Sequence, residues 1–323
     1  MFKRNESIVL VGGGGGVYRV ARFLKHLRPN ITTIQTVFDH GGHSGILRDE
    51  QGVLPPGDIR QAILALSDDN MEPSLRELMG YRFGENGKSS LDKATVGNIL
   101  LTALTEIEGS LPLAINTLSK LCGVQGKVLP VSLDDAELCV ELSDGSLLKG
   151  EGNIDTRSID DDRTILGAYL EPKARIFVDA YEAIVNADKI VFCPGDIYTS
   201  LIPNLLTEGF KEALAESGAK LIYCVNLMTK KAETDGYSVL DFVETVCKYA
   251  GKSLDYAIYN SGSIDQEVIA EYEEEKCYPV RFTSSDQTLA KKWVGANLVD
   301  RVDDGNGLMI RHHERIASVI ADF

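Results

Sequence analysis

The stretch that decides the fold is VLVGGGGGVYRV, residues 9–20, in which five glycines separate an apolar run from an amphipathic segment. The run ESIVLVGG is typical of a buried strand that ends at glycine. The next segment predicts a helix over residues 17–27 with an apolar face of Val17, Val20, Ala21, Leu24 and Leu27. Glycines at a strand–helix junction let the backbone approach a ligand and direct helix N–H groups at it, which suits a phosphate.

The glycine loop itself, comprising Gly12, Gly13, Gly14, Gly15 and Gly16, matches known phosphate motifs only in part. Gly12 and Gly14 fit GxGxxG, but Val17 stands in place of the third glycine, and no Gly-Lys-Ser/Thr follows as in a P-loop. The loop therefore predicts an anion site, with a tight turn that holds no ligand as the alternative. Asp39 stands where a dinucleotide fold keeps its ribose acid, so an NAD(P) oxidoreductase is a third, weaker interpretation.

Composition limits the partners of the chain. The 323 residues carry a net charge of −15, which argues against duplex nucleic acid or an anionic membrane surface as a broad partner. No apolar run reaches the roughly 18 residues of a membrane span, and the first strand follows MFKRNES without a leader segment. The six cysteines are widely spaced, as expected of buried free thiols in a cytoplasmic protein.

Apolar runs alternate with helical patterns along most of the chain. NITTIQTVFDHGG predicts a second strand that ends at Asp39, and DIRQAILALS and residues 95–122 predict helices. DKIVFCPG, AKLIYCVN and LDYAIYNSG predict strands, separated by the helices TSLIPNLLTEGFKEALAESG and SVLDFVETVCKYAG. This alternation indicates an α/β fold with a Rossmann-like parallel sheet flanked by helices.

The middle of the chain has a different pattern. KVLPVS, ELCVELSDGSLLKGEG and ARIFVDA are short runs separated by Asp-Gly and Asn-Ile-Asp turns, as expected of hairpins. We therefore expect a smaller, mostly antiparallel β insert over residues 127–185, with residues 1–126 and 186–323 forming the Rossmann-like domain. Asp160, Asp161 and Asp162 are expected to form a solvated turn.

A long polar loop, FDHGGHSGILRDEQGVLPPGDIR, follows the second strand and would lie at the carboxyl edge of the sheet, where open α/β folds bind ligands. A ribose acid needs no such loop, which argues against NAD. Its candidate ligand-binding residues are Asp39, His40, His43, Ser44, Asp58 and Arg60. His40 and His43 could bind a metal, but the spacing is short, and a hydrogen bond from a histidine to phosphate or Asp58 is favoured.

A second loop, CPGDIYTS at residues 193–200, also lies between a strand and a helix. Its N–H groups could form another anion site, and the alternative is simple helix capping by Thr199 or Ser200. Ser44 in GHSG does not have the spacing of a nucleophile elbow.

These motifs together resemble the YvcK/CofD-like family. The resemblance rests on GGGGG, TVFDHGGHSG, GVLPPGDIR, GNILLTALTEIEG, FCPGDIYTSLIPNLL, NLMTKKAETDGYS and the terminal IRHH, which occur in the family's order along the whole chain. The family has two branches, the gluconeogenesis factors and the 2-phospho-L-lactate transferases. The blocks Gly52–Arg60 and Asn226–Ser238 are particular to the first branch.

The resemblance implies a cytoplasmic protein that binds a nucleotide diphosphate sugar of the UDP-N-acetylglucosamine type, linked to cell shape and wall-precursor supply on gluconeogenic carbon sources. The alternative is an enzyme of coenzyme F420 biosynthesis that transfers a phospholactyl group from a guanosine diphosphate donor with Mg²⁺. In that case Asp39 and Asp58 would be the catalytic carboxylates, and Asp39 the metal ligand. No other cofactor is expected, and a homo-oligomer stays open.

The expected nucleotide site combines the glycine loop with residues from the later motifs. Arg311 would contact the diphosphate, with a surface charge as the alternative, and Tyr272 would stack on a base or sugar or pack in the core. The remaining expected contacts are Ser44, Arg60, Asn98, Pro194, Gly195, Asp196, Tyr198, Thr199, Ser200, Asn226, Thr229, Glu233 and Thr234.

The chain departs from the family pattern at four places. Gly15 stands where the loop usually has Thr, and Asp196 where Ser or Asn is commoner. Lys230-Lys231-Ala232 replaces a commoner Gln-Pro-Gly. His40 replaces the second acid of an Asp-Asp pair, which weakens the prediction of phosphoryl-group transfer because a protonated imidazole would repel Mg²⁺.

Overall fold

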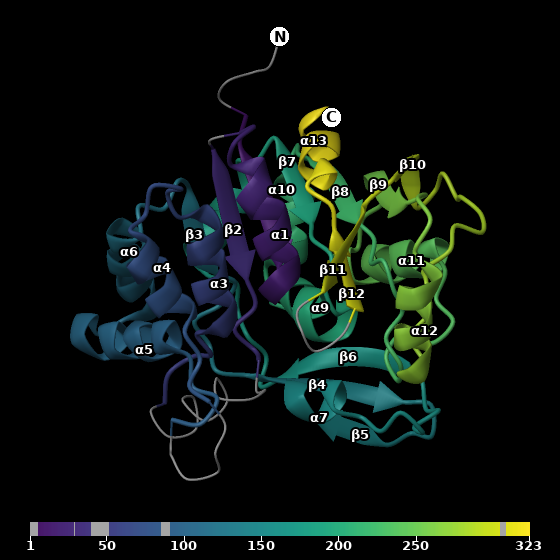
Figure 1. Ribbon diagram of the computed structural model, residues 1–323, viewed down its shortest axis with the longest axis horizontal. Helices are drawn as coiled ribbons and strands as arrows, with labels where there is room; N and C mark the ends of the chain where they lie inside the picture. The colour runs from purple at the N-terminus through teal and green to yellow at the C-terminus, as the bar shows by residue number, and fades with distance from the viewer. Residues whose placement is uncertain (1–5, 29, 40–51, 85–90, 304–307) are drawn as a thin grey trace.

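A seven-stranded parallel sheet forms the centre of the molecule (Figure 1). The computed structural model describes residues 6–28, 30–39, 52–84, 91–303 and 308–323. The strand order is β10-β9-β8-β7-β1-β2-β3, and every neighbouring pair is parallel. The strands are β1 (Ile8–Gly12), β2 (Ile31–Gln35), β3 (Lys127–Pro130), β7 (Lys189–Phe192), β8 (Lys220–Cys224), β9 (Leu254–Asn260) and β10 (Ala290–Ala296).

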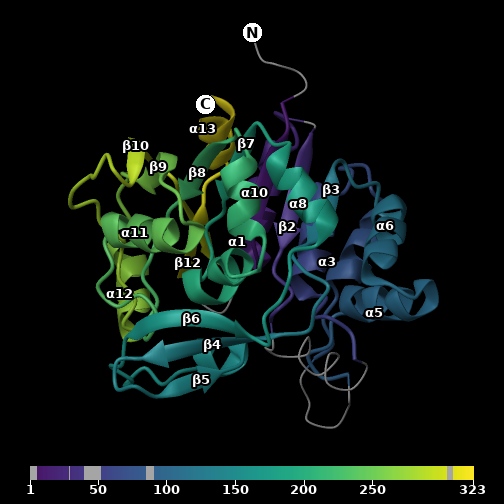
Figure 2. The same cartoon turned by 180° about the vertical axis from the view of Figure 1, so that it is seen from behind.

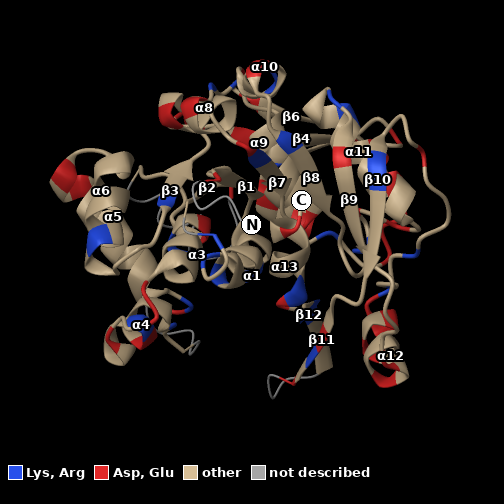
Figure 3. Ribbon diagram, turned by 90° about the horizontal axis from the view of Figure 1, so that it is seen from above, with Lys and Arg blue, Asp and Glu red and all other residues tan. Residues whose placement is uncertain are grey.

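Helices cover both faces of this sheet. Helices α1 (Gly14–Leu24), α3 (Gly57–Leu66) and α13 (Arg315–Ala321) lie on one face, and α8 (Val178–Val185) and α10 (Phe210–Glu216) on the other (Figure 2, Figure 3). The strands β1 and β7 are buried along their whole length because helices exclude water from both sides. The fold class predicted from the alternating pattern is confirmed.

The other described helices lie around this framework. They are α4 (Pro73–Gly80), α5 (Val96–Glu108), α6 (Leu111–Leu121), α7 (Glu151–Asp155), the π-helix η1 (Ile197–Leu201), α9 (Ile202–Leu205), α11 (Val239–Ala250) and α12 (Gln266–Glu274). Helix α11 begins with a capping box in which Ser238 and Asp241 satisfy each other's backbone N–H groups. None of the helices in the described ranges is long and apolar enough to cross a membrane.

Two small antiparallel sheets complete the fold. The strands β4 (Glu137–Leu142), β5 (Leu147–Lys149) and β6 (Ile165–Glu171) form a sheet that lies beyond the carboxyl ends of the parallel strands (Figure 1). The strands β11 (Val299–Asp303) and β12 (Leu308–His312) pair on their own. The predicted antiparallel insert is thus present, with its strands within residues 137–171.

Two segments assigned to the insert belong to the large sheet or to its helices. KVLPVS contains β3, which pairs in parallel with β2, and ARIFVDA leads into α8. A four-residue apolar run has the same pattern in a parallel edge strand and in a hairpin, so the sequence alone did not separate them. The division of the chain into domains at residues 127 and 185 stays a prediction.

Several predicted helices are shorter than expected. Residues 95–122 form two helices, because Gly109 adopts φ 74° between α5 and α6. The segment after residue 197 is likewise divided into η1, α9 and α10, with Gly209 at φ 99° before α10. Helix α1 ends at Leu24, which leaves Leu27 45% exposed, and β2 ends at Gln35 rather than Asp39.

The prediction for the cysteines is confirmed, and that for the acidic turn is wrong in part. All six cysteines are free thiols, five buried and Cys247 half-buried, as expected. The Asp160–Asp162 stretch is not simply solvated. Asp161 pairs with Arg157 and Arg163, and these partners hold the pKa of its carboxyl far below the ordinary value. Asp160 and Asp162 pair with lysines of other segments.

Candidate functional site

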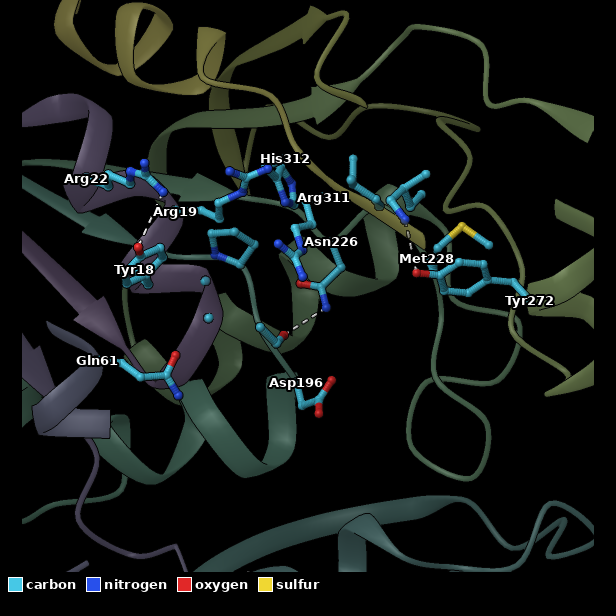
Figure 4. Close-up of a pocket in the computed structure, with 16 residues that line it drawn as sticks. Tyr18, Arg19, Arg22, Gln61, Asp196, Asn226, Met228, Tyr272, Arg311 and His312 are labelled. Atoms are coloured by element: carbon cyan, nitrogen blue, oxygen red, sulfur yellow. Dashed lines mark hydrogen bonds between the residues drawn. The ribbon is translucent and has the colours of Figure 1, made fainter. Parts of the chain in front are cut away.

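A cavity of about 530 Å³ opens at the carboxyl ends of β1 and β7. The strand order reverses between these two strands, and open α/β sheets bind ligands at such a point. Figure 4 shows the residues that line the cavity. They are Gly15, Gly16, Tyr18, Arg19, Arg22, Gln61, Pro194, Gly195, Asp196, Asn226, Leu227, Met228, Tyr272, Ile310, Arg311 and His312. The loops after β1, β7 and β8 therefore converge at one edge of the sheet, as predicted.

The glycine loop forms one wall of the cavity and needs small residues for steric reasons. A Cβ atom on Gly13 would lie 2.3 Å from Oδ2 of Asp58, and one on Gly16 would lie 1.5 Å from the carbonyl oxygen of Pro194. Gly14 has φ +51°, while a Cβ on Gly15 would meet nothing within 4 Å. Helix α1 begins at Gly14 without a side-chain cap from Gly13. The Gly14 N–H donates to Asp58, and the following N–H groups of the first turn are available at this wall.

Arginines give the cavity a positive side. Arg19 and Arg22 project from α1 and Arg311 from β12, and Figure 4 shows them on the same side of the cavity. Burial lowers the pKa of Arg19, and the charge of Arg311 lowers it further. The Nε atom of Arg19 is buried without a hydrogen-bond partner. An anion bound here would relieve both the repulsion and the unmet donor.

Polar and aromatic groups complete the lining. Asn226 donates from Nδ2 to the carbonyl of Gly195 at 2.8 Å, and its buried Oδ1 accepts no hydrogen bond. The hydroxyl of Tyr272 accepts the backbone N–H of Ile310 at 3.3 Å. Burial lowers the pKa of His312 to about 4, so its ring is neutral and its Nε2 lies 3.1 Å from the carbonyl oxygen of Val225.

A group of carboxylates lies beside the start of α1. Burial and the nearby charge of Asp39 raise the pKa of Asp58 to about 7, against a hydrogen bond from the Gly14 N–H that favours the charged form. Burial and Asp39 also raise the pKa of Glu151 to about 9, and Glu151 hydrogen-bonds with Asp39. Two carboxyl groups share a hydrogen bond only when one holds a proton. Asp39 and Asp58 have the hard oxygen ligands that Mg²⁺ prefers, so these residues would hold the ion if it binds.

Other predicted site residues make contacts within the protein. Arg60 donates from Nε to Oδ1 of Asn98 at 2.9 Å, and the Tyr198 hydroxyl lies 3.1 Å from that of Tyr237. Asp196 is the N-cap residue of η1 but makes no side-chain capping bond, and Thr199 and Ser200 lie inside η1, so neither is the predicted N-cap.

Three more predicted site residues lie in the loop after β8. Thr229 accepts the N–H of Tyr278 at 2.9 Å, Thr234 accepts that of Lys230 at 2.8 Å, and Glu233 pairs with Lys230. A ligand role for these residues stays a prediction. Gly12 ends β1. His40, His43 and Ser44 lie outside the described residues.

Sequence reasoning missed part of the cavity. It did not identify Arg19 and Arg22, whose polar helix face is typical of a solvated surface. The signal was their spacing, since Gly15, Arg19 and Arg22 lie on one face of a helix that starts at the glycine loop. Tyr18, three residues after Gly15 and four before Arg22, has a similar spacing and was also missed, whereas Gln61, Met228 and His312 had no such signal.

The comparisons with known proteins show the family of the chain. The family model for 2-phospho-L-lactate transferase CofD matches residues 8–299. The chain belongs to the CofD family. The gluconeogenesis factor of Bacillus subtilis is 35% identical over 99% of this chain and 98% of its own. That of Halalkalibacterium halodurans is 39% identical over 86% of this chain and 84% of its own.

A solved structure shares this fold. A crystal structure of a UPF0052 family member from Bacillus halodurans is 35% identical, covers 98% of this chain and 99% of its own, and superposes with a TM-score of 0.88. The two gluconeogenesis factors, at 35% and 39% identity over most of their own length, place this CofD-family chain with that branch, as its motifs indicated.

Proposed function

We propose that this CofD-family protein binds a nucleotide diphosphate sugar in the cavity between the glycine loop and Arg311. The observation that carries the proposal is that uncapped N–H groups at the start of α1 and three arginines line the same cavity. Both kinds of group bind phosphate oxygens, and two walls so equipped suit a diphosphate better than a single phosphate. A cavity of about 530 Å³ has the size of a small-molecule site.

The rest of the lining supports a nucleotide over a free anion. Tyr272 offers a ring against which a base or sugar can pack, and the unpaired Oδ1 of Asn226 can accept a hydrogen bond from a ligand hydroxyl or amide. The choice of uridine and N-acetylglucosamine follows from the family resemblance alone. The same resemblance is the basis for proposing a link to cell shape and wall-precursor supply.

If the protein were a transferase, Asp39 and Asp58 beside α1 would be its catalytic carboxylates. Asp58 and Glu151 both have raised pKa values, so fewer negative charges face Mg²⁺ at neutral pH than the residue types suggest. Weak metal binding at this position would disfavour efficient transfer, which needs the diphosphate charge neutralised.

The experiment is calorimetric titration of the full chain with UDP-N-acetylglucosamine, UDP-glucose, GDP and NAD⁺. The proposal expects a UDP-sugar to bind most tightly and, at 100 times its Kd, to stabilise the fold by about 2.7 kcal/mol. Binding of NAD⁺ alone would contradict it. A parallel assay supplies the guanylylated lactate donor, a deazaflavin acceptor and Mg²⁺, and turnover of about 1 s⁻¹ or above would assign the protein to the transferases.

A further inference from the structure

Lys230 lies inside a ring of three carboxylates that come from separate parts of the chain. Asp155 ends α7 next to the small antiparallel sheet, Asp196 follows β7, and Glu233 lies in the loop after β8. The Nζ atom of Lys230 lies 2.8 Å from both the Asp196 and the Glu233 carboxylates, and it also pairs with Asp155.

The ring has the geometry of a metal site. One oxygen from each of Asp155, Asp196 and Glu233 can be chosen so that all lie within 4.8 Å of one another. Such convergent carboxylate oxygens are the usual ligands of Ca²⁺, Mg²⁺ and Mn²⁺. The Glu233 side chain is only 1% exposed and neither of its carboxylate oxygens accepts a hydrogen bond, while Oε1 lies 2.8 Å from the Lys230 Nζ, so a cation is the partner of this carboxylate.

Glu233 is the buried member of the ring, while the side chains of Asp155 and Asp196 are 39% and 42% exposed. A buried carboxylate without a cation nearby would be strongly unfavourable. Burial alone would lower the pKa of Lys230, but Glu233 and Asp196 outweigh that effect and raise it above the ordinary value. Burial raises the pKa of Glu233 to about 7, although Lys230 acts in the opposite direction. The ammonium group therefore stays charged over the whole physiological range and supplies the positive charge that the ring needs.

We propose that the Lys230 ammonium is the resident cation of this ring and stands where a hard divalent cation would otherwise bind. Asp196 lines the cavity. The negative charge at this part of the cavity wall is therefore balanced by a lysine of the chain rather than by an exchangeable metal ion. The inference does not depend on which ligand the cavity takes.

Contacts outside the ring would keep its carboxylates in place without Lys230. Lys231 pairs with Asp162 at 2.9 Å, and Lys276 pairs with Asp160 at 3.0 Å. Arg157 also donates to the backbone carbonyl of Ala232. The bonds of Lys231 and Arg157 join the segment after α7 to the loop that contains Glu233, and the bond of Lys276 joins the same segment to the end of α12. Removal of one side chain should therefore open a cation site rather than separate its walls.

The test compares Mn²⁺ binding by the full-length wild type, Lys230→Ala and the double variant Lys230→Ala/Glu233→Gln. Electron paramagnetic resonance counts the bound ions, and carboxylates elsewhere bind equally in all three proteins. We expect Lys230→Ala to bind one more Mn²⁺ per chain than the wild type, and the double variant to lose that ion. Thermal unfolding should show a lower Tm for Lys230→Ala without metal and a recovery with Mn²⁺ that the wild type does not share.

Equal Mn²⁺ counts in the wild type and Lys230→Ala would overturn the proposal. So would a Mn²⁺ ion on the wild type that the single variant Glu233→Gln removes, because the ring would then hold a metal beside the ammonium. If Lys230→Ala does not fold with or without Mn²⁺, Lys230→Gln, which keeps most of the side-chain volume, provides the same comparison. Failure of UDP-sugar binding in the wild type would leave these counts unchanged.

Discussion

A methyl group on Gly16 would lie 1.5 Å from the carbonyl oxygen of Pro194. The glycine loop after β1 and the turn after β7 are therefore in direct backbone contact, and this contact closes one end of the cavity. Only glycine permits the approach, which explains one of the five glycines at this strand–helix junction.

Gly16→Ala should destabilise the fold by about 3 kcal/mol or more, because the added Cβ must displace backbone rather than a flexible side chain. Gly15→Ala is the matched control, since it lies one residue earlier in the same helix and meets nothing within 4 Å. Alanine there should leave stability unchanged or raise it by up to about 1 kcal/mol. Urea denaturation of both variants measures their free energies of unfolding. Equal destabilisation by the two substitutions would contradict the close contact between Gly16 and Pro194.

The raised pKa of Asp58 predicts a pH-dependent contribution to stability. The native chain retains this proton up to about pH 7, whereas the unfolded chain loses it near the ordinary value of 3.8. The contribution of Asp58 is therefore fully present below about pH 4 and is lost as the pH rises through 7.

Asp58→Asn removes this titration and keeps an oxygen that can accept the Gly14 N–H. The variant should gain about 1–3 kcal/mol relative to the wild type on going from pH 5 to pH 8. The free energy of unfolding of both chains at the two pH values gives this difference, because titrating groups distant from Asp58 contribute equally to both chains. If the difference in stability between the variant and the wild type is the same at pH 5 and at pH 8, burial of Asp58 does not raise its pKa.

Arg19 is predicted to contribute to ligand binding at a cost to the ligand-free protein. Its unpaired Nε and the nearby charge of Arg311 favour an anion at this position. Arg19→Gln should weaken UDP-sugar binding roughly tenfold and reduce its dependence on salt, while the stability of the free protein changes by less than about 1 kcal/mol. Titrations at low and high NaCl test this. An unchanged salt dependence would place Arg19 outside the ligand's reach.

The fold was largely predictable because its signals are local. The helices α3 and α11 follow apolar periodicity, and β1, β7, β8 and β9 are short apolar runs that end at turn residues. The parallel arrangement follows from their alternation with helices. The edge strands were harder. β3 is too short to separate from a hairpin, and β10, with an exposed and charged pattern, was not predicted.

The site was predictable only where its residues follow strands. Pro194 and Asn226 come directly after β7 and β8, so the edge of a parallel sheet brings them together. Tyr272 and Arg311 come from an added helix and hairpin, and only the family resemblance indicated them. The Lys230 ring was not predicted. Lys230 and Asp196 stood out only as separate departures from the family pattern, and Asp155 lies 75 residues from Lys230, so their contact depends on how the small sheet packs.

The most direct measurement of the central claim is calorimetric titration of UDP-N-acetylglucosamine into the wild type, Arg311→Ala and Arg315→Ala. Arg315 is an exposed arginine four residues away that does not line the cavity. A charged hydrogen bond to phosphate contributes about 1.5–3 kcal/mol, so Arg311→Ala should raise Kd roughly ten- to a hundredfold at unchanged Tm, and Arg315→Ala should have no effect. Equal affinity of the wild type and Arg311→Ala would contradict the account and remove Arg311 from the site.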